Sequence, residues 1–103
     1  MIFPERAFGN EATPSIGLVY IAGYLRQYGY DPCIIDGMVE ALNEVWPLKN
    51  FPGILCQGLR FSEIIARVPK ETKIIGVSAM FSGEWPVVRD FIFEIKKYFP
   101  NVI

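Results

Sequence analysis

The sequence predicts an α/β fold in which a parallel β-sheet is covered by helices on both faces. Short apolar strands alternate with helical segments in the order β-α-β-(α)-α-β-α-β, and helical crossovers are how parallel strands are connected. The run Cys33–Ile35 is apolar at consecutive positions, which is typical of a strand buried on both faces. The chain has 103 residues, of which 51% are hydrophobic, enough for the core of one domain.

The first part of the chain contains a strand end, a polar loop and a long helix. Met1–Phe3 is apolar and precedes a proline, so it is interpreted as the end of a strand, and residues 5–13 as a loop. A helix is predicted over about 15–28, because Thr13 can cap its first turn and Gly29 can end it. Since this helix is apolar on most sides, we expect it to be largely buried.

The rest of the chain continues the alternation. The expected elements are a short helix over 38–46, a loop over 47–58, a short helix over 62–68, a strand over 73–78, a helix over 84–99 and the start of a strand at 102–103. Proline or glycine residues separate most of these elements. Because the chain begins at the end of one strand and stops at the start of another, we expect residues 1–103 to be part of a larger domain, with a sheet truncated at both ends.

Composition excludes several classes of function. Ten basic residues balance eleven acidic ones, so no broad positive field is present for nucleic-acid binding. The longest apolar stretch, Ile16–Leu25, is shorter than the roughly 20 residues that span a bilayer, and no secretory signal is visible; we expect a cytoplasmic protein without a membrane partner. The chain contains no histidine, which removes histidine-based catalysis and most zinc sites.

Ligands of an open parallel sheet bind beyond the carboxyl ends of its strands, here residues 4–16, 36–38 and 78–85. Neither a GxGxxG nor a GxxxxGK[ST] motif is present, which disfavours an oxidoreductase with a nicotinamide or flavin cofactor. Without that glycine loop, Asp36 is interpreted as a turn residue rather than a ribose-binding acid.

Residues 78–85 are the most informative of these segments. Ser78 and Ser82 carry hydroxyl groups next to Met80, Phe81 and Trp85, and apolar walls with a few polar groups are the usual composition of a cofactor pocket. The alternative is structural: Met80 and Trp85 would lie in the core, and Ser82 would cap the last helix.

Two stretches of the chain resemble a known family. Residues 14–30, followed by Ile34-Ile35-Asp36, are similar to the pattern P-x-x-G-L-x-Y-L-A-x-Y-L-R-x-x-G-Y…I-I-D, and residues 75–86 form a second matching motif, with 95–101 behind it. Both resemble the N-terminal cobalamin-binding (B12-binding) domain of cobalamin-dependent radical S-adenosylmethionine (SAM) enzymes. The resemblance covers about residues 1–37 and 58–103.

The resemblance implies a flavodoxin-like (Rossmann-like) three-layer sandwich that lays the corrin ring against the carboxyl ends of its strands. Ser78-Ala79-Met80 matches a Ser-x-Leu that meets the nucleotide tail of the cofactor, with methionine in place of leucine. The implied cobalamin-binding residues are Pro14, Ile16, Gly17, Ser78, Ala79, Met80, Phe81, Glu84 and Trp85. No catalytic residue and no metal ligand is implied.

The chain departs from the family in two ways. It lacks the histidine that ligates cobalt in classical cobalamin domains, and it lacks the glycine-rich stretch after the fourth strand. The radical SAM domain, which would hold S-adenosylmethionine and a 4Fe–4S cluster, is also absent and is the expected partner.

The expected function is cobalamin binding for a B12-dependent radical SAM enzyme of the methyltransferase or the radical cyclase or rearrangement type, without catalysis by residues 1–103 alone. Exposed sheet edges would allow oligomerisation. The alternative is a non-catalytic, flavodoxin-like interaction domain with no cofactor.

Overall fold

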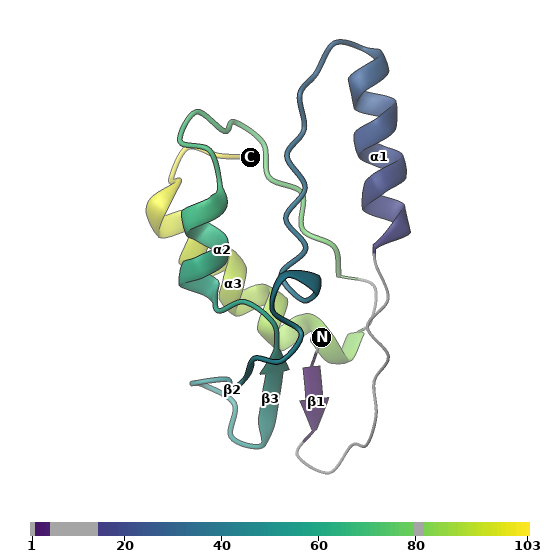
Figure 1. The fold of residues 1–103 in the computed structure, drawn as a ribbon. Coiled ribbons are helices and arrows are strands. Elements are labelled where there is room, and N and C mark those ends of the chain that lie inside the picture. Colours follow the sequence, from purple (N-terminus) through teal and green to yellow (C-terminus); the bar gives the residue numbers. More distant parts are fainter. Residues whose placement is uncertain (1, 5–14, 80–81) are drawn as a thin grey trace.

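A computed structural model describes residues 2–4, 15–79 and 82–103 (Figure 1). The elements are β1 (Ile2–Pro4), α1 (Ile16–Gln27), the 3₁₀ turn η1 (Val39–Ala41), β2 (Val45–Pro47), β3 (Ile54–Gln57), α2 (Phe61–Arg67), the 3₁₀ turn η2 (Ser82–Glu84) and α3 (Trp85–Tyr98). The predicted helices over 15–28, 62–68 and 84–99 are confirmed to within one residue at each end.

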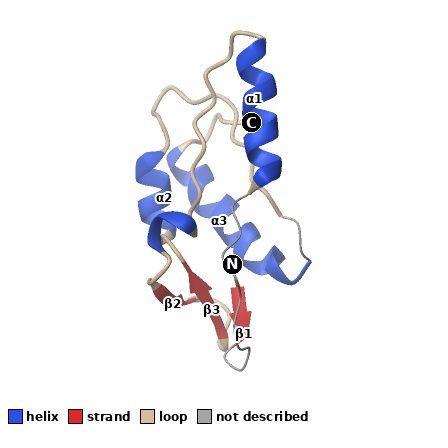
Figure 2. Ribbon diagram, turned by 45° about the vertical axis from the view of Figure 1, so that its right-hand side comes forward, coloured by secondary structure: helices blue, strands red, loops and turns tan. Residues whose placement is uncertain are grey.

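The described strands form a three-stranded sheet in the order β1-β3-β2, and both pairings are antiparallel (Figure 2). The prediction of a loop over 47–58 was therefore wrong for Pro47 and for Ile54–Gln57, which belong to β2 and β3, and Trp46 lies opposite Cys56 in this hairpin. The turn residues expected there are present, because Gly53 adopts a φ of +87° just before β3.

The predicted helix over 38–46 is reduced to η1, a single 3₁₀ turn. Asp36 precedes it, and its Oδ1 accepts hydrogen bonds from the backbone N–H groups of Met38 (3.2 Å) and Val39 (3.1 Å). Asp36 is thus a turn residue, as the sequence indicated.

The segments 33–35 and 73–78, predicted as strands, are not strands in the structure. One parallel pairing is nevertheless present. The N–H of Ile103 donates to the carbonyl of Lys73 (3.0 Å), and the N–H of Ile75 donates to the carbonyl of Ile103 (2.9 Å). These two bonds have the slanted geometry of a parallel bridge between Ile74 and Ile103. That the whole fold is a flavodoxin-like sandwich with a parallel sheet stays a prediction.

The best-packed core surrounds the hairpin. Trp46, Leu48 and Cys56 are each at most 8% exposed. Around them pack Phe51, Ile54, Phe61 and Val87. The indole Nε1 of Trp46 donates to the carbonyl of Gly58 (3.1 Å), so burying this side chain leaves no polar atom without a partner.

Helix α1 is the opposite case. The expectation that it is largely buried was wrong, because only Ala22 of its twelve residues is buried, and Ile16, Val19, Tyr20, Ile21 and Tyr24 are 58–76% exposed. Of the residues that the structure describes, Figure 1 places single extended segments, residues 30–36 and 72–79, beside α1 where the prediction had a sheet, and single segments cover less of a helix than a sheet does. In the described part of the chain, no helix is both long and apolar enough to cross a membrane.

Candidate functional site

The predicted cofactor-binding residues that the structure describes lie at the start of α1, at the end of the segment 72–79 and at the start of α3. Figures 1 and 2 both place the first turn of α1 beside the end of the segment 72–79. Pro14, Met80 and Phe81 lie outside the described residues, so their predicted roles stay predictions.

The described site residues are accessible. Ile16 is 66% exposed and Trp85 is 51% exposed, and Gly17, Ser78 and Ala79 are also exposed. The alternative that Trp85 belongs to the core is therefore wrong. A β-carbon built on Gly17 would meet no atom within 4 Å, so the space beside this residue is open.

Local sequence explains where α3 begins. Pro86 stands in the first turn of α3, where its missing N–H costs no hydrogen bond, and Glu84 is the residue that precedes the helix. The expectation that Ser82 caps α3 was wrong, since Ser82 begins the 3₁₀ turn η2 instead. The Glu84 carboxylate is half-buried at the positive end of α3.

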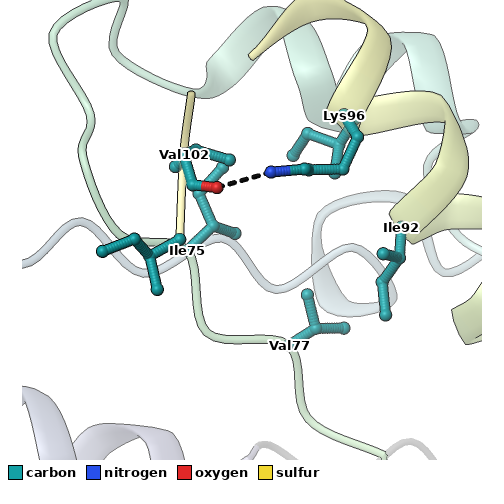
Figure 3. Close-up of a pocket in the computed structure, with 7 residues that line it drawn as sticks. Ile75, Val77, Ile92, Lys96 and Val102 are labelled. Atoms are coloured by element: carbon teal, nitrogen blue, oxygen red, sulfur yellow. Dashed lines mark hydrogen bonds between the residues drawn. The ribbon is translucent and has the colours of Figure 1, made fainter. Parts of the chain in front are cut away.

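A separate hollow of about 220 Å³ lies between the segment 73–77, α3 and the end of the chain (Figure 3). It is lined by Ile75, Val77, Ile92, Ile95, Lys96, Val102 and Ile103. The sequence placed these residues only in the expected strand over 73–78, the helix over 84–99 and the strand start at 102–103, and their spacing along the chain gave no sign of a hollow.

The hollow divides the segment 73–78 into two faces. Ile75 and Val77 face α3, and because side chains of extended backbone alternate, Gly76 and Ser78 lie on the opposite face. The ammonium of Lys96 donates to the carbonyl of Val102 (2.6 Å) and is thereby engaged in holding the end of the chain. The hollow is suited to helix–strand packing, and the exposed residues of the candidate site lie away from it.

The described groups whose pKa is shifted, Tyr24, Cys56 and Lys97, are not among the candidate site residues. Burial raises the pKa of the Cys56 thiol to about 11, which keeps it neutral and unreactive. A hydrogen bond to Tyr28 raises the pKa of Tyr24. Among residues 2–4, 15–79 and 82–103, no group of three or more histidine, cysteine, aspartate or glutamate side chains is placed to hold a metal ion. The site offers an exposed apolar surface with one hydroxyl and one carboxylate.

Comparison with known proteins relates the chain to a methyltransferase. That relative is cytidylyl-2-hydroxyethylphosphonate methyltransferase from Streptomyces wedmorensis, which is 34% identical over 74 residues. The matched region is 70% of this chain and 14% of the methyltransferase, so the chain spans a small part of its relative. No family model matches the chain, and no solved structure matches it. The chain is a distant relative of a methyltransferase.

Proposed function

We propose that the chain is the cobalamin-binding part of a B12-dependent radical SAM methyltransferase. The observation that carries the proposal is the relation to a methyltransferase, because the sequence patterns alone left methyl transfer and radical rearrangement open. The two motif stretches, residues 14–30 and 75–86, add the cobalamin part of the proposal by their resemblance to cobalamin-binding domains.

The position of the candidate site supports this proposal. Ser78 and Ala79 follow the segment that pairs in parallel with Ile103, and Ile16 begins the helix beside them. Ligands of parallel α/β folds bind beyond the carboxyl ends of the strands, and Ser78 and Ala79 would stand there in the flavodoxin-like fold that we expect.

The residues present fit cobalamin in chemical character. Ile16 and Trp85 offer exposed apolar surface to a flat ring, and the open space beside Gly17 leaves room for close approach to the helix backbone. The exposed hydroxyl of Ser78 can donate or accept a hydrogen bond at the nucleotide tail. Met80 would pack against that tail, Pro14 would border the ring, and Phe81 would belong to the loop that follows Ser78-Ala79-Met80, as the resemblance implies.

When bound, cobalamin supplies a cobalt ion that carries a methyl group. The 103 residues include no histidine, so an imidazole ligand to cobalt does not come from them. The part played by this chain is to bind and orient the cofactor, and the radical SAM partner domain would hold S-adenosylmethionine and the 4Fe–4S cluster.

Titration with hydroxocobalamin tests the proposal. We expect a saturable change in the visible spectrum and a higher melting temperature, since a ligand at about 100 times its Kd stabilises a protein by about 2.7 kcal/mol. A spectrum and a melting temperature that both stay unchanged at saturating hydroxocobalamin would contradict it.

The variant Ser78→Trp tests where the cofactor binds. A bulky indole at Ser78 fills the space needed by the nucleotide tail, so we expect binding to weaken by roughly tenfold or more. The matched control is Ser62→Trp, because Ser62 is exposed on α2, away from the candidate site. Equal affinities in the two variants would mean that Ser78 does not contact the cofactor.

A second candidate function is a flavodoxin-like interaction domain without a cofactor. The exposed apolar surface of α1 favours it, because large uncovered apolar patches mark protein contacts. A negative titration together with a folded protein would leave this candidate in place.

A further inference from the structure

Three tyrosines form an exposed stripe, two of them in α1 and the third directly after it. Tyr20, Tyr24 and Tyr28 are spaced by four, so they lie one above the other on one side of the helix. They are 76%, 61% and 66% exposed. Ile21, which is 58% exposed, lies beside them. We refer to Tyr20, Ile21, Tyr24 and Tyr28 as the tyrosine stripe.

Two tyrosines of the tyrosine stripe contact each other. The rings of Tyr24 and Tyr28 are 5.0 Å apart between centroids, and the Tyr24 hydroxyl donates to the Tyr28 hydroxyl (3.3 Å). Tyrosine has few rotatable bonds, so fixing it at an interface costs little conformational entropy. Tyrosine is also among the residues that contribute most to binding energy at protein interfaces.

The tyrosine stripe carries no charge that would repel a second copy of itself. Arg26 is the charged residue of α1, and it stands two positions from Tyr24 and Tyr28, which turns it to another side of the helix. Its guanidinium donates to the carbonyl of Pro32 (3.3 Å). Two copies of the stripe can therefore meet without burying an unpaired charge.

The area of the tyrosine stripe is enough for a weak dimer. An aromatic side chain can bury about 150–250 Å², so three tyrosines at about two-thirds exposure, with Ile21, offer roughly 500 Å² in each copy. Two copies would then bury roughly 1,000 Å², the lower limit for a specific interface. Two α1 helices that pack about a twofold axis present the same stripe to each other, and such a contact closes the assembly at two copies.

We propose that the tyrosine stripe is the interface of a symmetric dimer of this chain, in which two α1 helices pack against each other. The stripe begins one helical turn beyond Ile16, on the same side of α1, so the proposed contact adjoins the candidate cofactor site at the start of this helix. It also differs from association through sheet edges, which stays a separate prediction.

Sedimentation velocity or light scattering of the full chain over a range of concentrations tests this proposal. We expect a reversible equilibrium between monomer and dimer between about 1 μM and about 1 mM, as interfaces of this size give. The variant Tyr24→Glu would bury a carboxylate in the contact and weaken the dimer by roughly 100-fold. Tyr20→Glu is expected to do the same and serves if the first variant does not fold.

The matched control is Tyr98→Glu, because Tyr98 is also a helical tyrosine and is 66% exposed, but lies at the end of α3. We expect it to leave the dimer intact. A wild-type protein that stays monomeric up to about 1 mM, or one that forms species of indefinite size, overturns the proposal. So does a dimer that Tyr98→Glu weakens as much as Tyr20→Glu and Tyr24→Glu do.

Discussion

Two regions of the molecule use similar residues with opposite results. Around the hairpin of β2 and β3, aromatic and aliphatic side chains such as Trp46 and Leu48 are almost fully buried. On α1, residues of the same kinds, such as Tyr20 and Ile21, are more than half exposed. The difference lies in their neighbours: β3 pairs on both edges and packs under α2 and α3, whereas α1 lies beside single extended segments. Apolar character alone does not determine burial.

The two regions also differ in their hydrogen bonds. The backbone groups of the hairpin are paired in an antiparallel ladder, and the indole of Trp46 adds a bond to Gly58. Among the residues that the structure describes, the segment 72–79 makes two backbone bonds beyond the turn at its start, both to Ile103. Stability is therefore expected to reside in the hairpin region, and binding surface in the region of α1 and residues 72–79.

The largest expected effect is the difference in the free energy of unfolding between alanine variants of the two tryptophans. Trp46→Ala removes a buried aromatic side chain and is expected to lower the free energy of unfolding by about 3–5 kcal/mol. Trp85→Ala, at a half-exposed position, is expected to lower it by less than about 1 kcal/mol. Chemical denaturation measures both values. Losses of similar size would contradict the assignment of stability to the hairpin region.

The next largest expected effect is the difference in the free energy of unfolding between alanine variants of two glycines with positive φ. Gly58 has a φ of +112°, and a β-carbon there would lie 2.2 Å from the carbonyl oxygen of Gly37, so Gly58→Ala is expected to cost about 3 kcal/mol. Gly53 has a φ of +87° but open space around it, so Gly53→Ala is expected to cost about 1 kcal/mol. Denaturation of the two variants gives the comparison. An equal loss in the free energy of unfolding for Gly53→Ala and Gly58→Ala would contradict this prediction.

The buried Cys56 is expected to make the stability of the hairpin region depend on pH. Burial raises the pKa of the Cys56 thiol from 9.0 to about 11, so the folded state holds the neutral thiol more strongly than the unfolded state does. The resulting stability is present below about pH 9 and is expected to be lost as the pH rises towards about 11. Unfolding measured across this range checks the prediction, and Cys56→Ala should remove that contribution.

Reaction with a thiol reagent gives a second readout, which compares the two cysteines. Cys33 is exposed and should react in the folded protein, whereas Cys56 is buried and should react only after unfolding. Equal reaction rates at the two positions would show that the hairpin core opens as readily as the region of α1.

The smallest expected effect concerns the tyrosine stripe. Tyr24 donates a hydrogen bond to Tyr28, which favours the protonated phenol and raises the pKa of Tyr24. Tyr28→Phe should therefore lower the pKa of Tyr24 towards its ordinary value of 10.0, measured by the absorbance of tyrosinate. Tyr98→Phe is the control and should leave the titration of Tyr24 unchanged.

Local sequence signals predicted the helices well, because a helix is specified by residues close to one another in the chain. The spacing of Phe61, Ile64 and Ile65 and the proline after Val68 indicated α2 in this way. The pairing of Trp46 with Cys56 could not be predicted, since the two strands are three and four residues long and meet only through a non-local contact.

The candidate site could be predicted only in part. The turn role of Asp36 was accessible from sequence, because it follows a segment of apolar, β-branched residues and precedes a glycine. The burial of Trp46 and the exposure of Trp85 could not be predicted, because the burial of a tryptophan depends on partners that are distant in the chain.

Mapping of backbone amide shifts by NMR during titration with hydroxocobalamin tests the central claim most directly. That claim is that the end of the segment 72–79 and the start of α1 bind the cofactor, while the hairpin core serves stability. We predict saturable shifts at Ile16, Gly17, Ser78 and Ala79, with the amides of Trp46 and Cys56 unchanged. Shifts concentrated at Trp46 and Cys56, or no shifts at saturating cofactor, would contradict the account.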